Sequence, residues 1–262
     1  MNDDSSSLLP LADPVVRPVT VSDIVESLAD GMRDFQNAPV YGLTFGALYA
    51  VGGILIVIGV SALGASYLSY PLAAGFSLIG PLAAIGLYEV SRRRETGDPL
   101  SWSAVMGTTV AHRRELGSMA FAAVFVFVVW MYQVHLLIAL MLGQKSFVSL
   151  RDFLLVVTTT PEGWIFLIVE HLIGAVLLFI TFSVSVVSFP LLLDRDVDFV
   201  TAMITSVRAV VASPGPMIGW AAVIFLLLIV ACLLGFLGLL VVLPVLGHAT
   251  WHLYRRIVPR ET

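Results

Sequence analysis

Residues 164–193 read WIFLIVEHLIGAVLLFITFSVSVVSFPLLL, a run in which Glu170 and His171 are the only ionisable side chains. A buried strand needs about four to eight apolar residues, whereas a helix that crosses the hydrocarbon of a bilayer needs about twenty. The run is too long for a strand of a soluble domain, so it predicts a transmembrane helix. Comparable runs recur along the chain, and the sequence therefore predicts an all-α, polytopic transmembrane helix bundle.

The overall composition agrees with a protein that lies mostly in lipid. Of the 262 residues, 58% are hydrophobic and 12% are charged, against about 25% charged in a typical soluble domain. The net charge is −4, and the basic residues are scattered over loops and ends, so we expect no nucleic-acid partner. The single cysteine, Cys232, excludes an internal disulfide and a thiolate metal cluster within the chain.

The apolar stretches predict six spans. The last two could form one helix, but the 38 residues from 217 to 254 would extend about 57 Å at 1.5 Å per residue. A hydrocarbon core is only about 30 Å thick. We therefore predict a turn at residues 235–238, where Gly235 and Gly238 permit the backbone to reverse. The predicted spans are residues 40–66, 70–92, 117–142, 164–193, 217–234 and 237–254.

The distribution of arginine and lysine predicts the orientation, because these residues are retained on the cytoplasmic side. With six spans and both termini in the cytoplasm, only Lys145 and Arg151 lie outside. A model with five spans would move the last three arginines to the outer side. We expect a multi-pass protein of the bacterial inner membrane whose N- and C-termini are cytoplasmic. The cytoplasmic residues would be Arg17, Arg33, Arg92, Arg93, Arg94, Arg113, Arg114, Arg195, Arg208, Arg255, Arg256 and Arg260.

The chain divides into a tail and a membrane domain. Residues 1–19 are acidic and rich in serine and proline, a composition that predicts a disordered tail. They lack the basic start and apolar stretch of a secretory signal, so we expect the first span to direct insertion. Residues 20–262 would form the six-span membrane domain.

An internal repeat is predicted within that domain. Apolar residues recur at helical spacing before each odd-numbered span, a pattern typical of helices that lie at the membrane surface. Ser22, Ser101 and Asp198 are suited to cap the first turns of these helices. Each even-numbered span contains a proline: Pro81, Pro190 or Pro244. We predict three repeats of an amphipathic helix and a helical hairpin, at about residues 20–93, 98–193 and 196–257.

The repeat also predicts which side chains face the membrane. We expect Phe35, Trp102 and Phe199 to face the hydrocarbon or the bundle. We expect Asp30, Arg113 and Arg208 to face water.

Three blocks of the sequence resemble a known family. They are DGMRDFQNAPVYGLTFGALYAVGG at residues 30–53, AGFSLIGPLAAIGLYEVSRRRETGDP at 74–99 and SFPLLLDRDVDFVTAMITSVRAV at 188–210. In these blocks the chain resembles the DUF2189-like family of uncharacterised, polytopic inner-membrane proteins from proteobacteria. The resemblance implies a helical membrane fold and an inner-membrane location, and it supplies no catalytic residues.

Glu170 is the first candidate for chemistry, because an ionisable residue within a span is costly and is usually functional. His171 is its neighbour, and His135 in the third span is predicted to lie at a similar depth. The cluster of His135, Glu170 and His171 could relay protons or bind a cation. The alternative is a hydrogen-bonded contact that fixes the packing of two helices, with Gln133 close by.

His248 and His252 lie four residues apart and share one face of the last span. Such a pair can ligate a metal or haem. A complete site would need a further ligand such as Glu89, His112 or a residue of a partner chain. The alternative is an anchoring belt at the membrane interface, and we assign no cofactor.

Two groups of arginines could contact anionic lipid headgroups: Arg92, Arg93 and Arg94, and Arg113 and Arg114. Their role in setting the topology is a sufficient alternative explanation.

These observations leave three classes of function. The scarcity of charge within the spans favours a non-catalytic accessory, assembly or structural component of a membrane complex, with other inner-membrane subunits as partners. The repeat and the prolines are compatible with a small-solute or lipid transporter. The histidines are the basis for a haem- or metal-binding protein. No soluble-enzyme motif is present.

Overall fold

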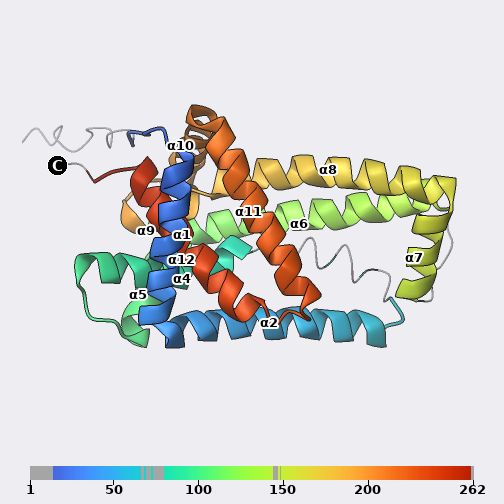
Figure 1. The fold of residues 1–262 in the computed structure, drawn as a ribbon, viewed down its shortest axis with the longest axis horizontal. Helices are drawn as coiled ribbons and strands as arrows, with labels where there is room; N and C mark the ends of the chain where they lie inside the picture. The colour runs from blue at the N-terminus through green and yellow to red at the C-terminus, as the bar shows by residue number, and fades with distance from the viewer. Residues whose placement is uncertain are drawn as a thin grey trace, which may run out of the picture.

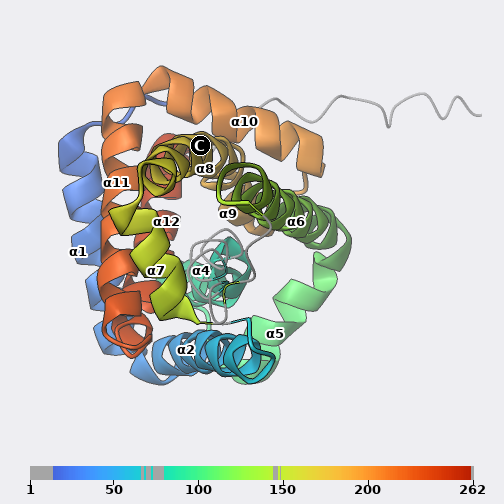
Figure 2. The same ribbon diagram turned by 90° about the vertical axis from the view of Figure 1, so that its right-hand side faces the viewer.

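The computed structural model describes residues 14–65, 68, 72, 80–143, 147 and 149–260, and Figure 1 gives its helical architecture. Three long helices, α2 (Pro39–Ala62), α6 (Arg113–Met141) and α8 (Pro161–Ser185), run along the long axis. α11 (Pro214–Leu233) is inclined across them. In Figure 2, which looks down that axis, these four helices surround α4. The remaining helices are α1 (Val21–Asn37), α4 (Gly80–Thr96), α5 (Trp102–Ala111), α7 (Leu150–Thr159), α9 (Ser188–Asp194), α10 (Phe199–Ala212) and α12 (Leu239–Ile257).

Among the residues that the structure describes, four helices are long and apolar enough to cross a membrane: α2, α6, the α8–α9 segment at Pro161–Asp194, and α11. They correspond to four of the six predicted spans. The predicted span at 237–254 corresponds to α12, which carries two histidines and two arginines. The predicted span at 70–92 ends in α4, and most of its first half lies outside the described residues. The all-helical fold is confirmed for the described residues. The two spans predicted at 70–92 and 237–254 stay predictions.

The short helices α1, α5 and α10 each lead into a long helix through one non-helical residue, and α7 leads into α8 through Thr160 in the same way. Ala38 joins α1 to α2, His112 joins α5 to α6, and Ser213 joins α10 to α11. Proline follows the linking residue in the first and third cases, where its fixed φ suits the first helical position.

The N-termini of the three short helices are capped by side-chain oxygens. Ser101 accepts a hydrogen bond from the backbone N–H of Ala104, and Asp198 accepts from those of Val200 and Thr201. These two caps confirm the prediction. The predicted cap Ser22 is wrong, because Thr20 occupies the cap position of α1 and forms a reciprocal capping box with Asp23.

Each short helix packs against a helix other than the long helix that follows it. α1 packs on α12, α5 packs on α4, and α10 packs on α8 and α9. α4, α9 and α12 also contact one another. The first helix of the chain therefore lies against the last, at the end of the molecule opposite α7 (Figure 1).

The contact between α1 and α12 requires a glycine. A Cβ atom at Gly31 would lie 2.5 Å from the backbone nitrogen of Ala249 and 2.7 Å from the carbonyl oxygen of Val245. Backbone atoms cannot move aside as the end of a side chain can. Gly31 thus sets how closely α1 approaches α12.

Two interruptions in the long apolar runs have local causes. α8 ends at Ser185 and α9 begins at Ser188, because Pro190 has no N–H to donate to the Val186 carbonyl. The free N–H of Val187 donates to Ser206 Oγ of α10 instead, at 3.1 Å.

The turn between α11 and α12 lies where it is predicted. Gly235 and Phe236 both have positive φ, at 64° and 66°, whereas Gly238 has φ −60°. Phe236 holds this unfavourable conformation because its ring packs directly on Gly53 of α2.

The predicted tail lies partly outside the described residues, at 1–13. Within residues 14–20, the backbone N–H of Arg17 donates to Ile257 O at 2.8 Å and that of Val19 donates to Ser213 Oγ at 2.8 Å. The segment just before α1 is thereby attached to α12 and to the start of α11.

We expect Gly31→Ala to lower the free energy of unfolding by about 2 kcal/mol, because the added methyl group forces α1 away from α12. Thermal unfolding of the purified protein in detergent measures this loss. The control is Gly59→Ala in α2, where an added Cβ meets no atom within 4 Å. Equal stability of the two variants would contradict the close contact.

Candidate functional site

The charged side chains of α1 lie on the face that meets α12. Asp23, Glu26, Asp30 and Asp34 recur at helical spacing, and Arg256 of α12 lies opposite the first three. Its Nη2 atom is 2.9 Å from Asp30 Oδ2 and 3.4 Å from Glu26 Oε2, and its Nε atom is 3.8 Å from Asp23 Oδ1. Asp30 is expected to face water, yet only 21% of its side chain is exposed.

Asp34 is the point where α1, α4 and α12 meet. Its Oδ2 atom accepts a hydrogen bond from Ser91 Oγ at 2.7 Å and lies 2.8 Å from His252 Nε2. Its Oδ1 atom accepts from Arg94 Nε at 2.7 Å. One buried carboxylate therefore joins three helices that are far apart in the sequence.

His248 extends this network. Its Nδ1 atom lies 2.7 Å from Ser91 Oγ. The Ser91 hydroxyl has one proton, which it donates to Asp34, so we assign the donated proton in the second contact to His248 Nδ1. The Nε2 atom of His248 is buried and has no hydrogen-bond partner among the described residues.

The electrostatics of Asp34 follow from its partners. Burial by itself raises the pKa of the Asp34 carboxyl, but hydrogen bonds from His252, Ser91 and Arg94 outweigh burial and lower the pKa to about 2. Asp34 is therefore ionised at neutral pH and balances the charge of Arg94.

Glu89 anchors a second part of the network between α4 and α5. It is fully buried and accepts hydrogen bonds from Arg92 Nε at 2.7 Å, from Arg93 Nε at 2.6 Å and from Thr108 Oγ1 at 3.0 Å. The arginines at 92–94, which we proposed as lipid contacts, are thus each paired with a carboxylate of the same chain. Arg113 and Arg114 are exposed.

A third set of contacts joins α4, α9 and α12. Arg255 lies between Glu95 of α4 and Asp194 of α9, at 3.1 Å and 2.9 Å. Tyr254 donates to Asp194 at 2.7 Å, and Trp251 Nε1 donates to Glu95 at 3.1 Å. These contacts attach the end of α12 to both neighbouring helices.

The two histidines proposed as metal or haem ligands lie on one helical face, as the spacing predicts. His252 lies against Asp34 and His248 against Ser91. Among the residues that the structure describes, no three His, Cys, Asp or Glu side chains are placed to hold a metal ion. The arrangement is a hydrogen-bonded joint between helices, and Asp34 and Ser91 are the members that we did not predict. The regularly spaced acidic residues of α1 were the feature of the sequence that could have indicated this joint.

The structure brings together only two members of the cluster proposed within the spans, Glu170 and His171. Glu170 is buried on α8, and His171 Nδ1 lies 3.2 Å from its Oε2 atom. His135 is exposed on α6, and within the described part of the chain it forms no ion pair with Glu170.

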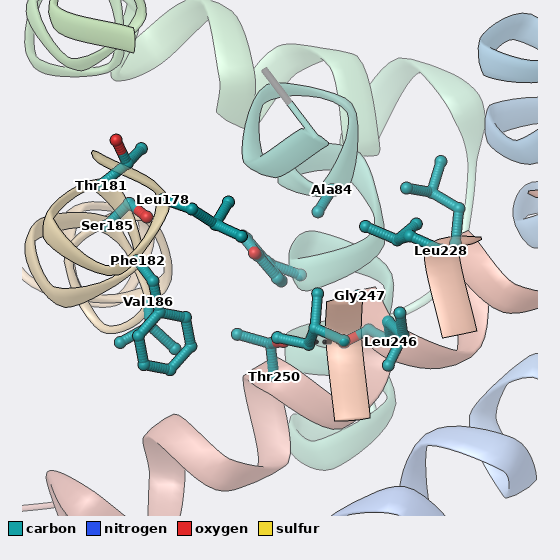
Figure 3. A pocket seen from close by; sticks show the side chains of 13 residues that line it. Ala84, Leu178, Thr181, Phe182, Ser185, Val186, Leu228, Leu246, Gly247 and Thr250 are labelled. Carbon is teal, nitrogen blue, oxygen red and sulfur yellow. Dashed lines mark hydrogen bonds between the residues drawn. The ribbon is translucent and has the colours of Figure 1, made fainter. Parts of the chain in front are cut away.

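A cavity of about 120 Å³ lies between α4, α8, α11 and α12. Figure 3 shows Leu178 and Phe182 of α8, with Val186 just after it, on one side and Leu228 and Leu246 on the other. The hydroxyls of Thr181 and Thr250 bond to carbonyl oxygens of their own helices. Because its lining is mostly apolar, the cavity suits hydrocarbon and offers little to a polar solute.

Comparison with known families agrees with this architecture. Residues 69–194 match the model of a family described as a predicted integral membrane protein (DUF2189). This match confirms the resemblance drawn from the sequence. No curated protein and no solved structure matches the chain.

We expect Asp34→Ala to cost about 3 kcal/mol of stability, because it leaves Arg94 and His252 partly buried without their carboxylate. Chemical or thermal unfolding in detergent measures the change. The control is Asp196→Ala, at an exposed position, where we expect less than about 0.5 kcal/mol. Similar losses in the two variants would contradict the joint.

Stability should also fall in acid in a way that depends on Asp34. Because the folded state binds this proton less tightly than the unfolded chain does, the carboxylate stabilises the fold above the ordinary Asp pKa of about 3.9. That contribution is lost as the pH falls toward 2. Between pH 4.5 and pH 2, the unfolding temperature of the wild type should drop further than that of Asp34→Asn. Parallel pH profiles would exclude this role.

Proposed function

We propose that this chain, whose residues 69–194 match an integral-membrane family, is a non-catalytic accessory, assembly or structural component of a complex in the bacterial inner membrane. One observation carries the proposal. In the four long apolar helices, only 17% to 22% of the residues in the apolar window are buried within the chain. The chain thus leaves a large apolar surface for lipid and for helices of other subunits, while the buried carboxylates Asp34 and Glu89 are paired within the chain.

Six spans in three repeats are part of the proposal. The units would be α1, α2 and α4; α5, α6 and α8–α9; and α10, α11 and α12. In the second and third units the short helix packs on the end of the preceding unit: α5 on α4, and α10 on α8 and α9. In the first unit, α1 packs on α12, the last helix of the third unit. This cyclic order is what three related units around one axis would give.

Two equivalent contacts support the repeat. Asp34 and Thr108 each lie four residues before the linking residue of their unit. Glu89 and His252 each lie eight residues after the proline of their helix, Pro81 or Pro244. Asp34 contacts His252 and Thr108 contacts Glu89. Matched positions in two units therefore contact matched positions in their neighbours.

The three short helices are proposed to lie at the cytoplasmic surface of the membrane. Each has exposed apolar side chains at helical spacing, as in Trp102, Met106 and Val110 of α5 and Val200, Ile204, Val207 and Val211 of α10. The exposed Arg113 and Arg114 follow the stripe of α5, where anionic headgroups would meet them. Both termini would then be cytoplasmic.

A second candidate function is a transporter for lipid or another hydrophobic molecule, and the cavity of Figure 3 favours it. Protein reconstituted in vesicles would move a hydrophobic probe, and Ala84→Leu, which fills the cavity, would stop that movement. Ala139→Leu, at an exposed position of α6, is the control. A haem or metal site at His248 and His252 has the least support, because both rings are engaged by Ser91 and Asp34.

Reporter fusions test the topology. Fusions after Arg94, after Arg208 and at the C-terminus should report the cytoplasm, and a fusion after Lys145 should report the outside, because twelve arginines then lie inside. An external C-terminus would rule out six spans.

Photocrosslinking tests the accessory role. A photoreactive residue at Ile168 of α8, which is 65% exposed, should crosslink a different membrane polypeptide in constant stoichiometry. The same residue at buried Val134 of α6 should give no intermolecular product. Crosslinks to lipid alone, or to a second copy of this chain, would contradict an accessory role.

A further inference from the structure

Two polar side chains are left unsatisfied inside the apolar α6–α8 hairpin. Glu170 is 1% exposed, and its Oε1 atom has no hydrogen-bond partner among the described residues. The Oε1 and Nε2 atoms of Gln133 are also buried and unpartnered there. Buried polar atoms are nearly always paired, so two such side chains in one helix pair need an explanation.

The packing of Trp130 sets the register of the hairpin. A Cβ atom at Gly174 would lie 2.6 Å from Cη2 of Trp130, so the indole ring lies directly on the backbone of α8. α6 and α8 run in opposite directions (Figure 1). Gln133 follows Trp130 by three residues and Glu170 precedes Gly174 by four. The two side chains are therefore displaced from this contact in the same direction, by about 4.5 and 6 Å.

The buried faces of the two helices bring these side chains opposite each other. Glu170 and Gly174 are four apart on the buried face of α8. Trp130 and Val134 are four apart on the buried face of α6, and Gln133, three after Trp130, lies on the same face. Gln133 and Glu170 thus lie at a similar height along the helix pair and face the same interface.

The charged groups around Glu170 leave its Oε1 atom without compensation. His171 of α8 lies 3.2 Å from the other oxygen, Oε2, and 56% of its side chain is exposed. His135 of α6, Arg151 and Asp152 of α7, and Arg208 of α10 are exposed. Asp194 of α9 is bound to Arg255 and Tyr254 at the far end of α8. An ionised Glu170 would therefore place an unpaired anionic oxygen in an apolar interface.

We infer that Glu170 and Gln133 form a proton-binding site within the hairpin. The carboxylate takes up one proton from solvent on Oε1 and becomes a neutral carboxylic acid, whose O–H donates to Oε1 of Gln133. A metal ion needs several oxygen ligands, whereas a proton needs one donor and one acceptor. His171, exposed and beside Oε2, is the group through which the proton exchanges with water. The inference does not depend on a partner subunit.

Infrared spectroscopy of the full-length protein in lipid nanodiscs at neutral pH tests the site. The wild type should have a carboxylic-acid C=O band that is absent from the isosteric variant Glu170→Gln. In Gln133→Leu the band should remain and shift to the higher frequency of an acid that has lost its acceptor. His135→Ala, at an exposed position of α6, should retain the wild-type band. Gln133→Met, of similar length, replaces the leucine variant if that protein does not fold.

Two outcomes would overturn the site. The first is a wild-type spectrum without an acid band that depends on Glu170. The second is a band unchanged by removal of the Gln133 amide, which would mean that the proton is not shared between these two residues.

Hydrogen–deuterium exchange of the acid tests the route through His171. In the wild type the deuterium shift of the band should follow the change of solvent at least about tenfold faster than in His171→Ala, because the exposed imidazole accepts and returns protons. Equal exchange rates would exclude His171 as the route.

Discussion

The pairing of the α1 carboxylates with α12 is the interaction on which the rest of the structure depends. Asp34 accepts hydrogen bonds from α4 and lies against His252 of α12, while Arg256 of α12 lies between three further acids of α1. A buried carboxylate without these partners would be strongly unfavourable, so the helices cannot separate one at a time at low cost. The same joint determines where the membrane-facing helices α2 and α11 begin relative to each other.

Close backbone contact and buried charge support each other at this joint. Gly31 allows α1 to touch the backbone of α12, and this short distance brings Asp34 within reach of His252. The pairing of Thr108 with Glu89 repeats the arrangement between α5 and α4 with an uncharged donor. The C-terminal ends of α4, α9 and α12 are then joined by Arg255. At the opposite end α7 packs on α8, and the apolar contact of Trp130 with Gly174 joins α6 to α8 near the middle of both helices.

The sequence predicts the features that depend on local patterns. Run length identifies the long helices, and the glycines locate the turn before α12. Ser101 and Asp198 cap their helices as expected. Thr20 was missed because Ser22, two residues later, has the same capping chemistry, and only the backbone conformation distinguishes them. The partners of His248 and His252 were missed for a different reason. Ser91 and Asp34 lie far away in the sequence, Asp34 more than two hundred residues from His252, and a single sequence does not show which distant residues meet in the fold. Likewise, depth alone associated His135 with Glu170, whereas the helical face, which the packing of Trp130 reveals, associates Gln133 with it.

The contact of α1 with α12 also bears on how the chain is made. α1 is synthesised more than two hundred residues before its partner Arg256. At roughly 5 to 20 residues per second, that interval is on the order of ten seconds or more. During this time the acidic face of α1 has no partner within the chain, and its carboxylates are best solvated in water. We therefore expect α1 to stay outside the hydrocarbon until α12 has been made, so that a late helix completes the packing of an early one.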